Sequence, residues 1–306
     1  MRALVTGATG FVGRHLVAHL AASGDDVTIS EAEMTDPGAL AADFDGSRPD
    51  AVYHLAAQAD VQASFADPAA TLRVNVEGTF NVLDAARRAG ASRVVVVSSA
   101  DVYGRVEPEN LPVDETAAML PVTPYGASKA AAEMVCVQAG LGGGVDVVRA
   151  RAFNHLGPGQ SGRFVAAALA SRVAANERTG ADEVRVGNLQ ARRDFTDVRD
   201  VVRAYRMLAA GGTPGEAYNV CSGAARRISE LAENLIARAR HPMRLVADSG
   251  LLRPVDVVDI SGNPSKLHGA TGWRPEVPLE QTLDDLLDYW RCRTRESHPA
   301  GHGDSQ

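Results

Sequence analysis

The sequence is short of cysteine and contains no long hydrophobic run. Its three cysteines, Cys136, Cys221 and Cys292, lie far apart and show no metal-binding spacing, so we expect unpaired, buried thiols and no metal site. No apolar stretch reaches the roughly 18 residues of a membrane span. The start MRALVTGATGF lacks the basic and apolar regions of a secretory signal. These absences predict a cytoplasmic protein without a membrane segment.

An excess of positive charge is also absent. The formal net charge of −7 argues against nucleic acid as a partner, and an anionic ligand would have to be held by local arginines and helix N-termini. The 45% hydrophobic and 23% charged residues are ordinary for a globular protein. A chain of 306 residues is long for one compact domain, so we expect a core domain and a smaller dependent one.

The first half alternates apolar runs of strand length with Ala- and Leu-rich segments of helical period. The predicted strands are continuously apolar because helices bury both faces of a parallel sheet. Strands are predicted at residues 3–7, 26–30, 50–57, 92–100 and 145–154, and helices at 11–24, 74–90 and 123–140. The fold class is therefore α/β, a Rossmann-type doubly wound parallel sheet with a smaller, interleaved α/β substrate domain.

The second half is less regular. Helices are predicted at 164–177, 228–239 and 279–290, a strand or loop at 185–195, and one more core strand at 216–223. We expect residues 1–153 to form the dinucleotide-binding domain, with 194–222 returning to it. Residues 154–193 and 223–293 are assigned to the substrate domain, and the polar tail 294–306 is expected to be disordered.

A glycine-rich turn stands between the first strand and the first helix. Gly7, Gly10 and Gly13 allow a tight turn and close backbone approach, so that the helix N-terminus can hold a pyrophosphate. Glu31 follows 18 residues after Gly13, at the end of the second strand, where an acid accepts bonds from the ribose hydroxyls. Its charge repels a 2′-phosphate, which favours NAD(H), with NADP(H) possible; alternatively, Glu31 is a solvated loop carboxylate.

Tyr125 and Lys129 share one face of a predicted helix that starts with Thr123 as N-cap and Pro124 at its first position. A cation close to a phenol lowers the phenol pKa, which would make Tyr125 a usable proton donor and acceptor. Two residues four apart are common, so the pair alone is weak evidence.

The segments TGATGFVG, HLAAQADV, NVEGTFNVLDAAR, VVVVSSADVYG, PYGASK, RDFTDVRDV, YNVCSG and GWRPEVPLEQTL together resemble the extended short-chain dehydrogenase/reductase family of nucleotide-sugar enzymes. The resemblance covers residues 1 to about 291. It implies that Ser99 bonds the substrate oxygen, that Tyr125 exchanges its proton, and that Lys129 holds the nicotinamide ribose. The cofactor-binding residues that it implies are Gly7, Thr9, Gly10, Phe11, Val12, Gly13, Glu31, Glu33, Met34, Leu55, Ala56, Ala57, Asn75, Tyr125 and Lys129.

The resemblance also implies a substrate class. The stretch VGNLQARRDF is similar to the GDP-sugar branch of the family, and Arg193 and Arg253 match its diphosphate-binding positions, with Arg192 as a spare. Either arginine alone could be an exposed loop residue. The substrate-binding residues implied are Ser99, Tyr125, Asn154, Val165, Gly187, Asn188, Leu189, Arg193 and Arg253. A homodimer is the expected assembly.

Asp101 bears on the reaction. Reduction of the 4-keto group of a GDP-4-keto-6-deoxy-hexose needs a hydride from the cofactor, a proton from Tyr125 and a bond from Ser99. A 4,6-dehydratase also needs an acid/base, which in the family is a Glu where this chain has Asp101, one methylene shorter. Asp101 favours reductase over dehydratase, with a turn-capping role equally open. An epimerase and a non-catalytic dinucleotide-binding scaffold are the remaining alternatives.

One segment departs from the family pattern. Between the strand at 26–30 and the strand at 50–57, roughly fifteen residues are missing, judged from the usual length of a βα unit. Glu31, Glu33 and Asp36 are therefore all candidates for the adenosine contacts, and the sheet could have an open edge.

Overall fold

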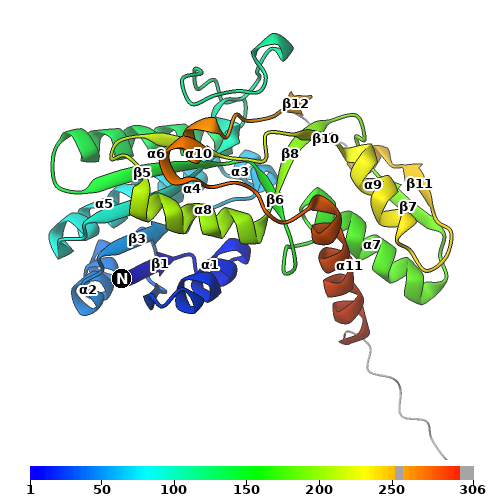
Figure 1. Ribbon diagram of the computed structural model, residues 1–306, viewed down its shortest axis with the longest axis horizontal. Helices are drawn as coiled ribbons and strands as arrows, with labels where there is room; N and C mark the ends of the chain where they lie inside the picture. Colours follow the sequence, from blue (N-terminus) through cyan, green and yellow to red (C-terminus); the bar gives the residue numbers. More distant parts are fainter. Residues whose placement is uncertain (252–257, 297–306) are drawn as a thin grey trace, which may run out of the picture.

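The central feature of the computed structural model, which describes residues 1–251 and 258–296, is a six-stranded parallel sheet (Figure 1). The strand order is β2-β1-β3-β4-β5-β9, and each neighbouring pair is parallel. The strands are β1 (Arg2–Thr6), β2 (Asp26–Ser30), β3 (Ala51–His54), β4 (Arg93–Ser99), β5 (Asp146–Ala152) and β9 (Ala217–Val220). The predicted Rossmann-type fold and the predicted core strand at 216–223 are confirmed.

Helices bury both faces of this sheet. Helices α1 (Phe11–Ala22) and α8 (Val198–Gly211) share one core with the strands, in which Leu16 and Tyr205 are fully buried. Helices α2 (Pro37–Ser47), α5 (Gly78–Ala89) and α6 (Pro124–Leu141) belong to a second core with Phe44 and Cys136. The connection from β3 to α5 runs through α3 (Val61–Ala66), α4 (Pro68–Leu72) and a π-helical turn, η1 (Arg73–Glu77). The shared cores explain the continuously apolar strands.

A second unit lies to the right of the sheet in Figure 1. Its core is formed by α7 (Val165–Thr179), α9 (Ile228–Ala237) and α11 (Leu279–Glu296), together with the strand pair β7 (Glu183–Val186) and β11 (Arg244–Ala247). A small sheet of order β10-β8-β12, with β6 beside β8, connects the two units. Its strands are β6 (Asn154–Leu156), β8 (Arg192–Asp197), β10 (Ala225–Arg227) and β12 (Asp259–Ile260).

Two predicted boundaries need correction. Strand β8 pairs within the small sheet, so the chain returns to the six-stranded sheet with α8 at Val198 and not at residue 194. Helix α11 continues to Glu296, three residues into the predicted tail, and Arg291 on its last turns pairs with Glu177 of α7. Residues 297–306 lie outside the described part of the chain. Four short elements complete the fold: η2 (Ala100–Val102), η3 (Pro108–Asn110), η4 (Ser249–Leu251) and α10 (Ser265–Thr271).

The two longest helices that were not predicted from the sequence are α2 and α8; the short helices α3, α4 and α10 were also missed. Helix α2 fills the shortened segment between Ser30 and Ala51, and the fully described chain there forms no further strand. Strand β2 therefore pairs only with β1 among the described strands and leaves an open sheet edge, as the shortened segment predicted. The expectation for the thiols is wrong at one position, since Cys136 and Cys221 are buried but Cys292 is exposed; all three are unpaired.

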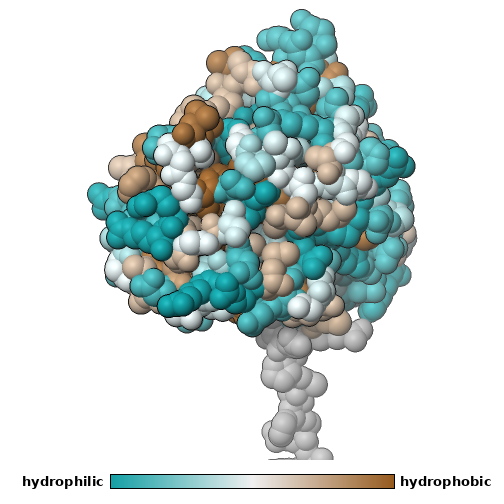
Figure 2. Space-filling view, turned by 60° about the vertical axis from the view of Figure 1, so that its left-hand side comes forward, coloured by the Kyte–Doolittle hydropathy of each residue, from teal (hydrophilic) through white to brown (hydrophobic). Residues whose placement is uncertain are grey.

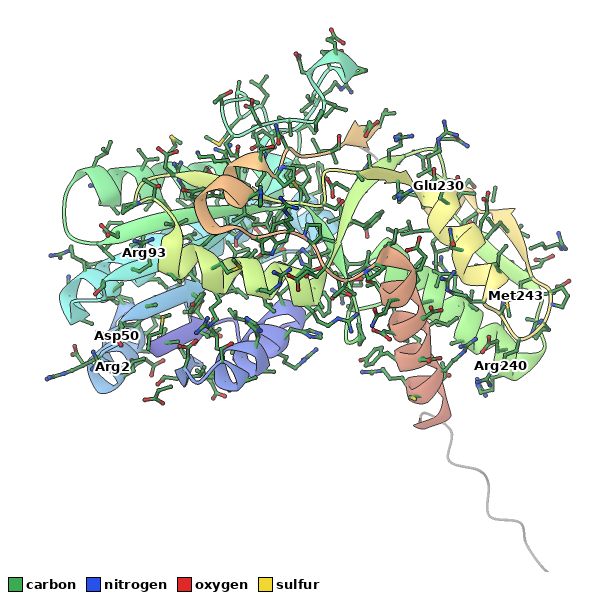
Figure 3. All side chains as sticks on the ribbon, viewed as in Figure 1. Arg2, Asp50, Arg93, Glu230, Arg240 and Met243 are labelled. Carbon is green, nitrogen blue, oxygen red and sulfur yellow. The ribbon has the colours of Figure 1, made fainter. Side chains whose placement is uncertain are left out.

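The strand direction places the carboxyl ends of the sheet toward the second unit. Arg2 begins β1, Asp50 precedes β3 and Arg93 begins β4, and all three are labelled on the left of Figure 3. Arg2 pairs with Asp50 at 2.6 Å, and Arg93 donates to the carbonyl of Gly212, so this edge is occupied by structural contacts. Ligands of open α/β sheets bind at the opposite, carboxyl edge. No helix within residues 1–251 and 258–296 is long and apolar enough to cross a bilayer.

Candidate active site

The glycine-rich turn joins β1 to α1 in a conformation that only glycine fits. Gly7 has φ of +70°, and a Cβ there would lie 2.6 Å from the main-chain nitrogen of Ala56. A Cβ on Gly13 would collide with the carbonyl oxygen of Gly7. The turn therefore closes tightly under the first turn of α1, whose N-terminus faces the carboxyl edge of the sheet. This is the cradle that a dinucleotide pyrophosphate requires.

A cavity of about 410 Å³ opens beside this turn. It brings together seven of the predicted cofactor residues from three segments of the chain: Gly7, Thr9, Glu31, Glu33, Met34, Ala56 and Ala57. Ala8, Ser30, Ala32, Gln58 and Val74 complete its lining and were not named from the sequence. The lining excludes the other predicted cofactor residues, Gly10, Phe11, Val12, Gly13, Leu55, Asn75, Tyr125 and Lys129.

The charge of the cavity is negative. Glu31 and Glu33 line it, and its described lining contains no Arg or Lys. Asp36 has a structural role instead: its carboxylate caps α2 by accepting from the main-chain nitrogens of Gly38 and Ala39 at 2.9 and 3.0 Å. Of the three candidates for the adenosine contacts, Glu31 and Glu33 line the cavity and Asp36 does not.

Asn75 lies in the π-helical turn η1 and is almost fully buried. Its amide accepts from the main-chain nitrogen of Gln58 at 2.8 Å and donates to Oγ of Ser128 at 2.8 Å. The Ser128 hydroxyl in turn donates to the carbonyl of Tyr125. Asn75 therefore connects the segment after β3 to the first turn of α6, which fits the supporting position that the resemblance implied.

Helix α6 begins as its sequence predicts, with Thr123 accepting from the main-chain nitrogen of Gly126 at 2.9 Å. Its first turns place Tyr125 and Lys129 on the buried face, against the end of β4. Nζ of Lys129 donates to the carbonyl of Val97 at 2.9 Å. Ser99 ends β4 and makes a side-chain hydrogen bond with Tyr125. Ser99, Tyr125 and Lys129 thus meet at the carboxyl edge of the sheet.

Burial dominates the electrostatics of these groups. It raises the pKa of Tyr125, the charge of Asp101 raises it further, and the hydrogen bond with Ser99 partly offsets both effects. The expectation that Lys129 lowers the Tyr125 pKa below its ordinary value is therefore not met, because burial and the charge of Asp101 raise that pKa. Burial lowers the pKa of Lys129 to about 8, against the opposing charges of Cys136 and Glu133.

His54 is a buried neighbour of the site that sequence reasoning missed. Its ring nitrogens lie 2.8 Å from Oγ1 of Thr6 and 3.1 Å from Oγ1 of Thr79. Burial and the charge of Lys129 lower its pKa to about 3, so the imidazole is neutral. The Thr6 hydroxyl also accepts from the main-chain nitrogen of Ala56. His54 thereby fixes the end of β3 beneath the glycine-rich turn. Its place in the HLAA segment, which carries the family resemblance, was the sequence feature that could have indicated this role.

Asp101 follows Ser99 in the turn η2, and its main-chain nitrogen donates to Oγ of Ser99 at 3.1 Å. Its charge raises the pKa of Tyr125, so Asp101 lies near the same site. The structure therefore places the residue on which the choice between reductase and dehydratase depends beside the proposed proton donor.

The substrate-binding candidates come from two places. Asn154 is exposed on β6, and Arg193 lies on the neighbouring strand β8, where it donates to the carbonyl of Arg192. Arg192 pairs with Asp259 at 3.2 Å, in keeping with its assignment as the spare arginine.

The other candidates lie in the second unit. Val165 begins α7, and Leu189 packs against the same core. The loop at Gly187 approaches η4, since a Cβ on Gly187 would lie 2.6 Å from the carbonyl oxygen of Leu251. Asn188 accepts from the main-chain nitrogen of Gln190 at 2.9 Å. Arg253 lies outside the described residues.

The parallel sheet, the glycine cradle and the Tyr-Lys helix define a dinucleotide-dependent oxidoreductase of the extended short-chain type. A family model described as GDP-mannose 4,6 dehydratase matches residues 23–286. GDP-6-deoxy-D-mannose reductase of Pseudomonas aeruginosa is 40% identical over 96% of this chain and 99% of its own length. The chain therefore belongs to the GDP-mannose 4,6-dehydratase family of nucleotide-sugar oxidoreductases.

Solved structures agree with this assignment. RMD from Pseudomonas aeruginosa, solved with NADPH, aligns with a TM-score of 0.89 and 39% identity, covering 96% of this chain and 100% of that one. UDP-glucose 4-epimerase of Thermus thermophilus, solved with NAD, aligns with a TM-score of 0.86 and 30% identity, covering 95% and 99%. A nicotinamide dinucleotide is thus the cofactor of the group, while the choice between NAD and NADP differs between relatives.

Proposed function

We propose that the protein reduces the 4-keto group of a GDP-linked 4-keto-6-deoxy-hexose. The observation that carries the proposal is the meeting of Ser99, Tyr125 and Lys129 at the carboxyl edge of the sheet, in a chain similar over its whole length to a GDP-6-deoxy-D-mannose reductase. GDP-sugar dehydratases and nucleotide-sugar epimerases are also relatives, so the reaction direction rests on the details of the site.

The residues can divide the work of a carbonyl reduction. A bound nicotinamide cofactor supplies the hydride. The raised pKa of Tyr125 keeps its phenol protonated, which suits a donor that must give a proton to the oxyanion developing at C4. Ser99 bonds the same oxygen, and the Lys129 ammonium, held by Val97, stabilises the phenolate that remains. Arg193 is the residue that we assign to the diphosphate.

Asp101 favours reductase over dehydratase. Elimination across C5 and C6 needs an additional acid/base at a reach that the shorter Asp side chain does not provide, and an error of about 1 Å can cost ~100-fold in rate. Its charge also helps to keep the Tyr125 phenol protonated, as a proton donor requires.

We favour NADH over NADPH as the hydride source. The adenosine side of the cavity carries Glu31 and Glu33 and no basic residue among the described lining, an arrangement that suits ribose hydroxyls and repels a 2′-phosphate. The glycine cradle fits the pyrophosphate of either cofactor. The unpaired cysteines and the use of a reduced nicotinamide fit a reducing compartment, the cytoplasm.

We infer a homodimer, and the surface of helices α3 to α6 supports this proposal. Large apolar side chains are exposed there although the helices pack on the sheet, notably Phe80 at 53% and Leu141 at 85% exposure. Figure 2, which brings the left-hand side of Figure 1 forward, shows apolar residues set among hydrophilic ones on this side. A second copy is the partner that we assign to them. Light scattering after Phe80→Asp should show a monomer; an unchanged mass would reject this interface.

The reaction itself is tested by mixing the protein with GDP-4-keto-6-deoxy-mannose and NADH or NADPH. We expect the absorbance of the reduced cofactor to fall in proportion to the sugar converted. GDP-mannose alone should give no 4-keto product, and UDP- or dTDP-linked keto sugars should be poor substrates. An unchanged absorbance with both cofactors contradicts the reductase. A 4-keto product formed from GDP-mannose without net consumption of cofactor indicates the dehydratase.

A further inference from the structure

A buried ion-pair network lies directly behind the proposed catalytic residues. Glu133 is on α6, one turn beyond Lys129, and is 1% exposed. Its carboxylate accepts from Nε and Nη2 of Arg151 at 2.9 and 2.8 Å, and from Oγ of Ser98 at 2.6 Å. Arg149 adds a longer contact at 3.3 Å. A two-pronged arginine–carboxylate pair fixes orientation as well as distance.

The other side of Arg151 reaches the turn that carries Asp101. Nη1 of Arg151 donates to the hydroxyl of Tyr103 at 3.0 Å, and that hydroxyl donates to Oδ1 of Asn219 at 2.6 Å. Tyr103 directly follows η2 and is 1% exposed. Burial raises the pKa of Tyr103 to about 12, so the hydroxyl keeps its proton for Asn219.

The network therefore links two segments that supply different halves of the site. The segment 98–103 supplies Ser99 and Asp101, and helix α6 supplies Tyr125 and Lys129. Arg151, one residue before the end of β5, joins the first segment through Tyr103 and the second through Glu133. Buried ionic networks are costly to break and impose one geometry.

We propose that Arg151 and Glu133 are positioning residues: they hold the 98–103 turn in register with α6, and the charge of Glu133 keeps Lys129 in its ammonium form. The proposal rests on the roles of Ser99, Tyr125 and Lys129 given under the proposed function. Arg151 and Glu133 act through these residues, and neither needs to touch the sugar.

The charge part of the proposal follows from the surroundings of Lys129. Burial lowers the pKa of Lys129 to about 8, and Glu133 is one of two groups that oppose this effect. The titratable and charged groups of the elements around Lys129 are Tyr125, Glu133 and Cys136 on its own helix, His54 on β3, Asp101 in η2, and Arg149 and Arg151 on β5. His54 is neutral, and burial raises the pKa of the Cys136 thiol to about 12, so Glu133 is the ionised member of the two groups that raise the pKa of Lys129.

The composition of the chain makes this charge measurable. The sequence contains two lysines, Lys129 and Lys266, so carbon-13 labelling of the lysine side chains gives two signals to follow by NMR against pH. In the wild type the Lys129 signal should titrate near pH 8. Glu133→Gln should move that titration to lower pH by about one unit, because the stabilising anion is gone. Lys266, which pairs with Glu216 on the surface, is the internal control.

The positioning part is tested with Tyr103→Phe, which removes one hydroxyl and no charge. We expect kcat for the keto sugar to fall about 10-fold or more, because the turn and helix shift relative to each other, while KM for the cofactor stays the same. Tyr53→Phe is the matched control, since that hydroxyl is buried on β3 with no hydrogen-bond partner among the described residues. It should leave kcat unchanged.

A folding defect in Glu133→Gln would arise from the unpaired Arg151. The double variant Glu133→Gln, Arg151→Met removes both charges, whose effects on the Lys129 pKa oppose each other, so it tests the positioning role through kcat. An unchanged Lys129 titration in Glu133→Gln overturns the charge role, and a wild-type kcat in Tyr103→Phe, Ser98→Ala and the double variant overturns the positioning role. The NMR measurement does not depend on turnover. If the wild type showed no reductase activity, the proposed function would be rejected, and the Lys129 titration would still test the role of Glu133.

Discussion

Nζ of Lys129 donates a hydrogen bond to the carbonyl oxygen of Val97 at 2.9 Å, two residues before Ser99 on the same strand. This bond ties helix α6 to β4 at the level of the proposed catalytic groups. The ammonium is buried, so solvent screens its charge only weakly and the charge acts strongly on the neighbouring groups. The relationship explains how a strand end and a helix start, far apart in sequence, form one site.

Lys129→Met should abolish most of the turnover. The substitution retains the length of the side chain but removes the cation that stabilises the Tyr125 phenolate, and we expect kcat to fall at least ~100-fold. Measured kcat against pH in the wild type should also decline as pH rises through about 8, where the ammonium loses its proton. Lys266→Met, at an exposed ion pair with Glu216, is the control and should retain full activity.

Tyr125→Phe removes the proposed proton donor and leaves the ring packing in place. Turnover should fall by about 100- to 10,000-fold, while titration of cofactor fluorescence should show nearly unchanged affinity, because the cavity lining is untouched. Retained turnover would refute the proton role of Tyr125. A matched loss of cofactor affinity would instead indicate that the phenol holds the nicotinamide ribose.

Much of this arrangement could be predicted from the sequence because it depends on local chemistry. The glycine turn and the Thr123 cap specify their own backbone, and the apolar strands report burial on both faces. Helix α8 was missed but could have been predicted, since Val198, Val201 and Tyr205 follow a helical period on a buried face.

The pKa of Tyr125 and the role of Asp36 could not be predicted in the same way. The first depends on how deeply the three-dimensional fold buries the phenol, which the spacing to Lys129 does not report. The second depends on the unexpected helix α2, which takes the Asp36 carboxylate for its own N-cap. The Arg151–Glu133 network was missed because its partners come from separate segments and carry no shared motif.

Glu31→Ala should weaken the preference for NADH. The carboxylate lines the adenosine side of the cavity, where it attracts ribose hydroxyls and repels a 2′-phosphate, so its removal should lower the ratio of kcat/KM for NADH over NADPH about 10-fold. Asp45→Ala, an exposed acid on α2 outside the cavity, controls for net charge. A wild type that prefers NADPH would show that the Glu31 assignment is wrong.

Asp101→Asn should leave a working reductase. The substitution keeps the size of the side chain and removes the charge that raises the pKa of Tyr125. We expect reduction to persist within about 10-fold of the wild type, with its high-pH limit moved to lower pH as the phenol ionises more readily. Loss of turnover at every pH would show that Asp101 itself transfers a proton and would revive the dehydratase hypothesis.

His54 should make the fold sensitive to acid. Its pKa is about 3 in the folded chain against an ordinary value of 6.5, so between these values the unfolded chain binds a proton that the folded chain refuses. Stability from this group is fully present above pH 6.5 and is lost as pH falls toward 3.

His54→Gln isolates this contribution. The wild-type free energy of unfolding should fall relative to that of the variant by up to about 1.4 kcal/mol per pH unit below pH 6.5, measured by urea denaturation at a series of pH values. The variant loses the bonds to Thr6 and Thr79 at every pH, which sets a constant offset between the two curves. Parallel curves from about pH 7 to 4 would mean that the folded chain accepts the proton at His54, and that the imidazole is not held neutral beneath the cofactor turn.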